Sequence, residues 1–321
     1  MTRMLSLAAL AAVLAVGAQA QTKWDMALAY PVGNYHTVNA QKFADAVKAR
    51  SGGKLEIVLH PNGSLFKAPE IKRAVQTAQV PIGEVLMVNL HNEDPFYSAD
   101  GVPFLATSFA DAKKLMDAQK PGIARRMGSQ GVVFLYAVPW PPQGIYADKE
   151  LKSLGDMEGL KWRAYSPQTA RIAEIVKAQP LTIQAAELAQ ALATGKVNSF
   201  VSSGVTGVDS KTYEHLKFFH DTQAWLPKNM VLVNHSLYSR LDEATRRVLV
   251  EEAQKAEAAG WEAAKKIQDE SIATLAKNGM TIVKPSAQFV TELKTKVGAP
   301  MIAEWAKGAG GDGEMLAKAL K

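Results

Sequence analysis

Hydrophobic and polar positions along the chain follow the two periods that are typical of strands and helices. Alternation over 24–30 predicts a strand, and apolar residues at the i, i+3, i+4, i+7 spacing over 40–47 predict a helix. The pattern continues with a strand over 55–59, a helix over 71–78 and a nearly all-apolar strand over 81–88. This order of elements predicts an α/β fold with a largely parallel sheet.

The same pattern returns in the rest of the chain. Strands are predicted over 131–138, 160–165 and 196–201, and helices over 166–178 and 183–195. A long helix is predicted from about Asp242 to Asn278, and a short strand over 281–283 follows it. The glycine-rich stretch 308–313 indicates a turn or a loose tail. No linker divides the chain, so periodicity alone leaves open one doubly wound domain or two lobes joined by ordered crossings.

The first twenty residues have the layout of a secretory signal peptide. Arg3 precedes an apolar run over 5–16, and residues 18–20 form a small-x-small cleavage site. The run is shorter than the roughly 20 residues that a membrane-spanning helix needs. We therefore expect a signal peptide at 1–20, a mature chain that starts at Gln21, and a soluble exported product.

Composition excludes several classes of function. The 321 residues include no cysteine, which removes thiolate metal sites, cysteine nucleophiles and disulfides. A chain of this length can bury a sufficient core without disulfides. The net charge is +6, and basic and acidic residues are interspersed, so a nucleic-acid partner is not expected. The excess of positive charge is compatible with a weak attraction for anionic ligands.

Patterns that carry catalysis are missing from the sequence. There is no Gly-x-Ser-x-Gly elbow, His-Glu-x-x-His helix or phosphate loop. Residues 51–54 match Ser-x-x-Lys but end a helix, and 308–313 match a dinucleotide fingerprint but follow no strand. The histidines and acids over 214–221 lack the spacing of a helical metal site. No catalytic residue, metal or cofactor is therefore expected.

Two residues stand out as candidates for ligand binding. Arg163 lies near the end of a predicted strand, just before a helix start, and a guanidinium matches the geometry of a carboxylate. From this pattern alone, a ligand carboxylate and a glutamate of the chain are equally good partners. His36 follows the first strand, where open α/β sheets place ligand loops, although a helix-start residue facing solvent fits the same position.

Four segments carry a resemblance to a known family. They lie at 51–65 (SGGKLEIVLHPNGSL), 102–105 (VPFL), 154–163 (LGDMEGLKWR) and 187–198 (ELAQALATGKVN). Their order and spacing, together with the long helix, resemble the DctP-type substrate-binding subunits of tripartite ATP-independent periplasmic (TRAP) transporters. The resemblance covers essentially the whole mature chain.

The resemblance implies an α/β, two-lobed periplasmic binding protein, with a ligand cleft between the lobes and a long helix that spans them. Lobe I would comprise 21–140 plus about 228–267, and lobe II 141–227 plus about 268–321. Such a protein would bind a small organic carboxylate without changing it and deliver it to the membrane permease subunits of an ion-gradient-driven transporter. It would neither bind nucleic acid nor insert into the membrane.

The resemblance also implies the residues of the site. The family's carboxylate-binding arginine falls on Arg163, and we expect Tyr30, Asn34 or His36 of the other lobe to complete the contacts with the ligand. Trp140, Phe200 and Trp225 are expected either on the apolar side of the ligand or in the core.

The sequence departs from the family pattern in ways that concern the ligand. Many members that bind sialic acid or dicarboxylates carry a second basic residue near Gln143, and many carry an asparagine in place of Ser202. Leu86 and Met87 stand where some members have polar pocket groups. We therefore expect a monocarboxylate with a hydrophobic or aromatic body. A C4-dicarboxylate is the alternative if Lys161, His36 or another cation reaches its far end. A secreted enzyme or a ligand-sensing domain is the alternative class.

Overall fold

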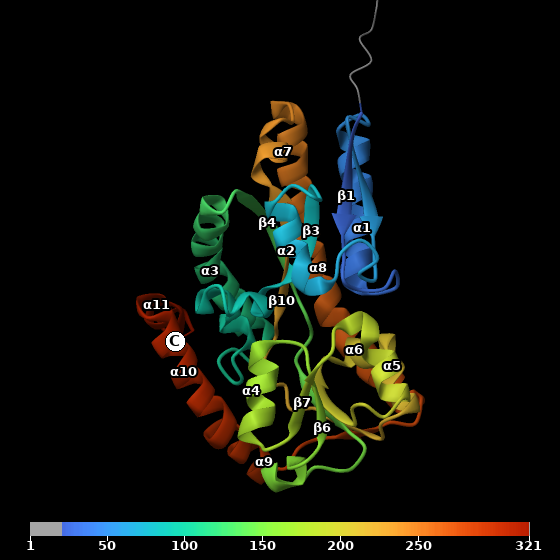
Figure 1. The fold of residues 1–321 in the computed structure, drawn as a ribbon, viewed down its shortest axis with the longest axis vertical. Coiled ribbons are helices and arrows are strands. Elements are labelled where there is room, and N and C mark those ends of the chain that lie inside the picture. Colours follow the sequence, from blue (N-terminus) through green and yellow to red (C-terminus); the bar gives the residue numbers. More distant parts are fainter. Residues whose placement is uncertain (1–20, 321) are drawn as a thin grey trace, which may run out of the picture.

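The structure is a computed structural model that describes residues 21–320, so the predicted signal peptide at 1–20 lies outside the described residues. Two sheets covered by helices form two lobes along the long axis of the molecule (Figure 1). The strand order is β2-β1-β3-β10-β4 in the first sheet and β11-β9-β5-β8-β6-β7 in the second. The predicted two-lobed α/β fold is confirmed.

The sheet of the first lobe combines local and distant strands. Its strands are β1 (Thr22–Ala27), β2 (Leu55–His60), β3 (Ile82–Leu86), β4 (Val132–Pro139) and β10 (Lys228–Asn234). β1 pairs in parallel with β2 and β3, whereas β10 runs antiparallel to β3 and β4. The sheet is therefore mixed, and the expectation of a largely parallel sheet holds only for its first three strands.

Helices and short 3₁₀ turns cover this sheet. The helices are α1 (Tyr35–Arg50), α2 (Ile71–Gln76), α3 (Phe109–Ser129) and α7 (His235–Ser239), and the turns are η1 (Ala68–Glu70), η2 (Met87–Leu90) and η3 (Pro95–Gly101). Asn34 caps α1 by accepting a hydrogen bond from the backbone N–H of His36. Ser108 caps α3 in the same manner.

The sheet of the second lobe is built mainly from the middle of the chain. Its strands are β5 (Gly144–Ala147), β6 (Lys161–Ala164), β7 (Gln179–Thr182), β8 (Ser199–Ser202), β9 (Phe218–His220) and β11 (Thr281–Val283). The helices are α4 (Pro167–Ile175), α5 (Leu188–Ala193), α6 (Gly204–Asp209) and α9 (Ala287–Glu292), with 3₁₀ turns η4 (Leu154–Met157), η5 (Ala185–Glu187) and η6 (Thr212–Glu214). β5 is antiparallel to β8 and β9, so this sheet is also mixed.

The long helix α8 (Glu243–Lys277) contacts α1 and β4 of the first lobe and α6 and β11 of the second. Asp242 caps its N-terminus by accepting from the backbone N–H of Thr245. At Gly260, a β-carbon would lie 2.4 Å from a methyl group of Val138, so the close approach of the helix to the first sheet requires glycine. The predicted helix thus exists and spans both lobes (Figure 1).

The C-terminal segment returns to the first lobe. After α9 and a π-helical turn at Leu293–Gly298, α10 (Ala299–Ala309) and α11 (Gly311–Ala319) pack against η3 and α3. Of the two alternatives predicted for 308–313, the turn is confirmed at Gly310, which has a φ of +56° between α10 and α11. The loose tail is wrong, because the residues on both sides of Gly310 are helical. The division of the chain into lobes stays a proposal, and by packing α11 would belong with the first lobe.

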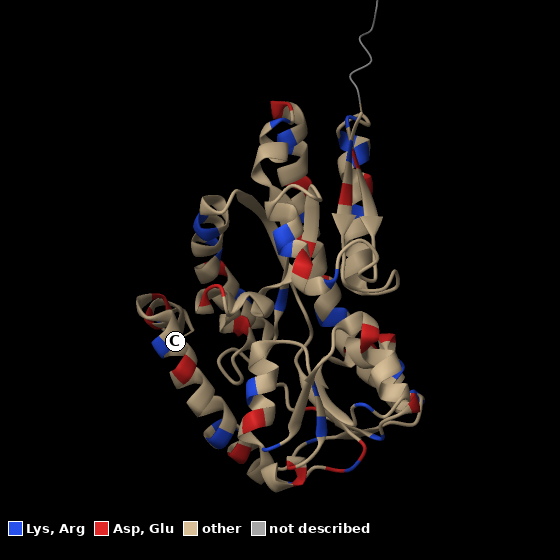
Figure 2. Ribbon diagram, viewed as in Figure 1, with Lys and Arg blue, Asp and Glu red and all other residues tan. Residues whose placement is uncertain are grey.

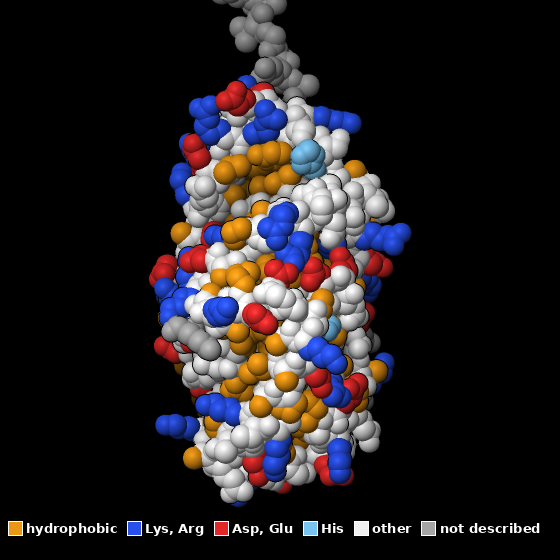
Figure 3. All heavy atoms as spheres, turned by 90° about the vertical axis from the view of Figure 1, so that its left-hand side faces the viewer, with side chains coloured by type: hydrophobic (Ala, Val, Ile, Leu, Met, Phe, Trp, Pro, Cys, Tyr) orange, Lys and Arg blue, Asp and Glu red, His pale blue; other side chains and the backbone are white. Residues whose placement is uncertain are grey.

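Charged residues of both signs are distributed over both lobes (Figure 2). On the face that carries α3 and α10, basic and acidic side chains alternate with small apolar groups (Figure 3). Within residues 21–320, no helix combines the length and the apolar character needed to cross a membrane.

Candidate functional site

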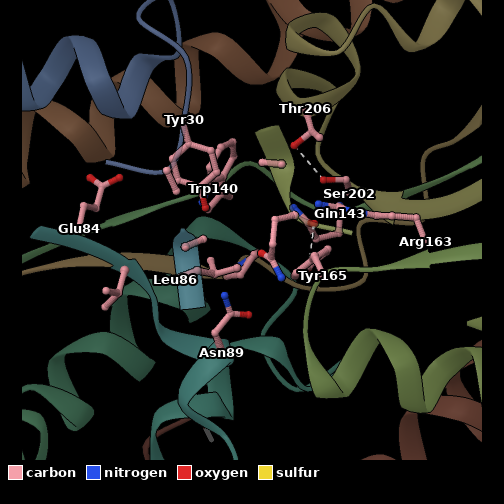
Figure 4. Close-up of a pocket in the computed structure, with 16 residues that line it drawn as sticks. Tyr30, Glu84, Leu86, Asn89, Trp140, Gln143, Arg163, Tyr165, Ser202 and Thr206 are labelled. Carbon is pink, nitrogen blue, oxygen red and sulfur yellow. Dashed lines mark hydrogen bonds between the residues drawn. The ribbon is translucent and has the colours of Figure 1, made fainter. Parts of the chain in front are cut away.

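A cavity lies where the two lobes meet, with about 560 Å³ of space between protein atoms, part of which is open to solvent (Figure 4). Both lobes and the crossings between them contribute to its wall. The lining residues are Ala29, Tyr30, Ala68, Glu84, Val85, Leu86, Asn89, Trp140, Gln143, Arg163, Tyr165, Gln184, Ala185, Ser202, Thr206 and Pro227.

The two chain crossings beside the cavity hydrogen-bond to each other. The backbone N–H of Trp140 donates to Pro227 O at 2.7 Å, and that of Gln143 donates to Trp225 O at 3.0 Å. One crossing follows β4 and the other precedes β10, so the first sheet holds both in place. These two hydrogen bonds hold the crossings together where Trp140, Gln143 and Pro227 line the cavity.

Arg163 reaches the cavity from β6 and is only 3% exposed. Its Nε atom donates to Ile183 O at 2.8 Å, and its guanidinium carbon lies 5.0 Å from the centre of the Tyr165 ring. Burial lowers the pKa of Arg163 to about 10, so the side chain remains charged at neutral pH. No carboxylate among the described residues forms an ion pair with it, which leaves N–H groups free to bind an anion.

Polar groups of the second lobe are held by hydrogen bonds around Arg163. The hydroxyl of Tyr165 donates to Gln143 Oε1 at 3.2 Å, and Gln143 Nε2 donates to Pro141 O at 3.0 Å. Ser202 Oγ donates to Thr206 Oγ1 at 2.8 Å. These bonds fix the side chains before any ligand arrives, which lowers the ordering cost of binding.

The first lobe presents an aromatic wall backed by a buried acid. The ring of Tyr30 meets that of Trp140 edge-on at a centroid distance of 4.8 Å. Trp140 Nε1 donates to Asn229 Oδ1 at 3.0 Å, and Asn229 Nδ2 donates to Glu84 Oε1 at 2.8 Å. Burial raises the pKa of Glu84 to about 7, so this carboxyl is partly protonated at neutral pH.

Asn34 and His36 lie beside the cavity and do not line it. Asn34 Nδ2 donates to Asp209 Oδ2 of the opposite lobe at 2.7 Å. His36 is buried behind the aromatic wall, with its ring centre 4.4 Å from that of Trp140 and its Nδ1 3.8 Å from Glu84 Oε2. Burial lowers the pKa of His36 well below its usual value, so its ring is neutral. Neither residue therefore lines the cavity in this conformation, and their contact with a ligand stays a prediction.

Three further residues proposed from the sequence also lie off the cavity wall. Met87 follows Leu86 in extended backbone and turns into the core of the first lobe, where it is fully buried. Phe200 stacks on Tyr146 at a centroid distance of 4.4 Å within the second lobe. Trp225 lines a separate apolar cavity with about 290 Å³ of empty space.

The structure thus brings together six of the residues singled out from the sequence: Tyr30, Leu86, Trp140, Gln143, Arg163 and Ser202. Sequence reasoning missed several polar members of the wall, which are Glu84, Asn89, Tyr165, Gln184 and Thr206. Glu84 carried a signal, since it is an acid within an otherwise apolar strand. Asn89 and Gln184 carried none, because turns commonly contain such residues.

Among residues 21–320, no group of three or more histidine, aspartate or glutamate side chains is arranged to hold a metal ion.

Comparison with known proteins agrees with this geometry. The family described as bacterial extracellular solute-binding protein, family 7 (DctP), matches residues 29–307. Two Bordetella pertussis extracytoplasmic solute receptors, DctP6 and DctP7, are 52% and 42% identical, each with a TM-score of 0.91 and coverage of 93% of this chain and 99% of the receptor. A TRAP solute-binding protein from an unidentified marine microbe is 43% identical, with a TM-score of 0.91 and coverage of 94% and 98%. The chain belongs to the DctP family of bacterial extracellular solute-binding proteins.

Proposed function

We propose that this TRAP-type solute-binding protein captures pyroglutamate, or a closely similar cyclic monocarboxylate, in the cavity between its lobes and presents it to membrane permease subunits. The observation that carries the proposal is Arg163, a buried cation on the cavity wall with no carboxylate partner among the described residues. Removing such a charge from water is unfavourable unless an anion compensates it. A ligand carboxylate supplies that anion.

The comparisons support the choice of ligand. DctP6 and DctP7 are described as binding pyroglutamic acid, and the marine protein as specific for pyroglutamate. Pyroglutamate is a monocarboxylate, as expected from the sequence, but its body is a small polar lactam ring and not an aromatic group. An exported chain with this function would act in the periplasm.

The charges on the wall disfavour a C4-dicarboxylate. Arg163 is the single basic residue among those that line the cavity, so a second carboxylate would lack a cation there. Glu84 lies on the same wall and would repel a second anion whenever it is ionised. One positive and one acidic group therefore suit a ligand with one carboxylate and a neutral polar remainder.

Closure of the lobes would complete the site. Arg163 belongs to the second lobe, whereas Tyr30 belongs to the first, so a ligand that touches both draws the lobes together. Exclusion of water then strengthens each polar contact because the local dielectric constant falls. The closed form is the state that we expect the permease to recognise.

Calorimetric titration of the mature protein, freed of co-purified ligand by unfolding and refolding, tests this proposal. L-Pyroglutamate should bind with a Kd of about 1 μM or lower, which corresponds to roughly 8 kcal/mol. Succinate and benzoate should bind at least about 100-fold more weakly, a difference near 2.7 kcal/mol. Tighter binding of succinate, or no binding of any of the three acids, would contradict the proposal.

A further inference from the structure

Asn89 presents a carboxamide to the cavity from η2, the turn that follows β3 in the first lobe. The side chain points from this turn toward Leu86 and the interior of the cavity (Figure 4). Its Oδ1 atom is buried and accepts no hydrogen bond from any of residues 21–320. Buried polar atoms are almost always paired, so an unpaired acceptor on the wall of a binding cavity indicates a partner that the protein itself does not supply.

The neighbouring polar groups on the wall are already engaged. Gln143 uses both ends of its amide, donating to Pro141 O at 3.0 Å and accepting from the hydroxyl of Tyr165 at 3.2 Å. Ser202 is bonded to Thr206 at 2.8 Å. Asn89 differs from these groups because its buried Oδ1 atom has no hydrogen-bond donor among residues 21–320.

We propose that Asn89 is a specificity-determining residue that recognises the cyclic amide of the ligand through paired hydrogen bonds. This inference rests on the proposed function. A small ring holds an amide in the cis form, which places its N–H and C=O side by side on one edge. The carboxamide of asparagine offers the complementary acceptor and donor side by side. Oδ1 would accept from the ring N–H while Nδ2 donates to the ring carbonyl.

Asn89 and Arg163 belong to different lobes, which suits a ligand whose cyclic amide and carboxylate are bound by different residues. Arg163 comes from β6 of the second lobe, and Asn89 comes from the first lobe, so the two ends of a small acid would be held from opposite sides of the cavity. Both contacts together are available only when the lobes are closed. Recognition of the amide would then contribute directly to closure.

Gln184 is the competing carboxamide on the wall. It directly follows Ile183, whose carbonyl accepts the Nε hydrogen bond of Arg163, so it belongs to the same lobe and lies beside the carboxylate-binding end. Gln184 and Asn89 are both partly exposed, so their locations and not their burial separate the two. The location of Gln184 suits contact with the carboxylate or with solvent better than contact with the far edge of the ring.

Titration of the wild type and of Asn89→Leu with three acids of similar shape tests the inference. L-Pyroglutamate carries the full amide, 5-oxotetrahydrofuran-2-carboxylate lacks the N–H, and cyclopentanecarboxylate lacks both polar groups. The wild type should prefer the lactam over the carbocycle by about 100-fold or more, with the lactone between them. In Asn89→Leu this preference should shrink by about 10- to 100-fold, mainly through weaker binding of the lactam.

Asn92→Leu, an exposed asparagine just beyond the same turn, is the matched control and should retain the wild-type preference. Asn89→Ala provides a second variant if leucine disturbs the fold, and melting curves without ligand verify folding. An unchanged preference in folded Asn89 variants, or a preference that disappears in Gln184→Leu instead, would overturn the inference. Failure of the wild type to bind any of the three acids would instead count against the proposed function.

Discussion

Asn34 and Asp209 lie 175 residues apart in the sequence and join the two lobes through a hydrogen bond of 2.7 Å. Asn34 caps α1 of the first lobe with its oxygen, which leaves its amide N–H₂ to reach Asp209 at the end of α6 in the second lobe. Burial raises the pKa of Asp209 to about 6. Asn34, which was proposed from the sequence as a ligand contact, thus joins the two lobes in this structure.

Loss of the Asn34–Asp209 bond should speed the release of ligand. We expect Asp209→Ala to raise the dissociation rate of pyroglutamate by about 3- to 10-fold, the value of one ordinary hydrogen bond. The change leaves the cap of α1 intact, because Asn34 caps through its own oxygen. Stopped-flow displacement measures the rate.

A second contact between the lobes provides the control for this experiment. Lys67 Nζ lies 3.3 Å from Glu187 Oε1, but both side chains are more than half exposed, at 64% and 53%. Exposed ion pairs contribute little, so Glu187→Ala should change the rate by less than about twofold. Equal effects of the two substitutions would show that the part-buried Asn34–Asp209 bond has no special part in closure.

Replacement of Arg163 should weaken ligand binding without destabilising the fold. We expect Arg163→Ala to weaken pyroglutamate binding by about two to three decades, because the ligand carboxylate loses its buried partner. Without ligand, the melting temperature should stay the same or rise, since the substitution removes an uncompensated buried charge.

Arg163→Lys is the conservative companion to this variant. Lysine keeps the charge but lacks the planar fork of donors, so it should recover only part of the affinity. Calorimetry and thermal melting check both variants, and near-wild-type affinity of Arg163→Ala would refute the assignment of the carboxylate site.

Glu84 should make the stability of the ligand-free protein depend on pH. Its pKa is about 7 in the folded state against an ordinary value of 4.5, so the folded protein holds this proton more tightly than the unfolded chain does. The free energy of unfolding should therefore fall as the pH rises from about 4.5 to about 7, by up to roughly 3 kcal/mol from this group.

Glu84→Gln removes this titration and keeps an oxygen to accept from Asn229. Urea unfolding of the wild type and the variant at pH 5 and pH 8 should show the variant gaining relative stability at the higher pH. An identical pH dependence in both proteins would mean that Glu84 does not titrate in this range.

Fluorescence should distinguish the two tryptophans near the site. Trp140 lines the cavity, whereas Trp225 lines the separate apolar cavity. We expect Trp140→Phe to abolish most of the fluorescence change caused by pyroglutamate and Trp225→Phe to retain it. The opposite result would indicate that the ligand contacts Trp225 and that this residue belongs to the site.

Substitution of Gly144 should show how tightly the start of β5 is packed. A β-carbon at Gly144 would lie 2.4 Å from a ring carbon of Phe219 and 2.7 Å from His220 O. Gly144→Ala should therefore lower the free energy of unfolding by about 1–3 kcal/mol. Gly128→Ala, where nothing lies within 4 Å of the added carbon, is the control and should be neutral or slightly stabilising in urea unfolding.

Elements with strong local periodicity were predicted well. The helix expected from about 242 to 278 is α8 (Glu243–Lys277), and the strand expected over 281–283 is β11. β10 was not predicted, although the apolar run MVLV over 230–233 is typical of a buried strand. Its pairing with β3 and β4, which come from much earlier in the chain, is visible only in the structure. The helical end of the chain was missed because glycines within 308–313 suggested a loop, while contacts with α3 and η3 hold the helices there.

The amino-acid sequence alone determined the fold class, the long helix and the candidate status of Arg163, because periodicity and residue chemistry are local properties of a chain. Only the tertiary structure decided which residues share the cavity, since Glu84 and Asn89 meet Arg163 through the approach of two lobes. It also showed that Asn34 contacts Asp209 of the opposite lobe. The physical reason is that the direction of a side chain and its distance from a distant segment depend on the packing of the whole molecule, which no local pattern encodes.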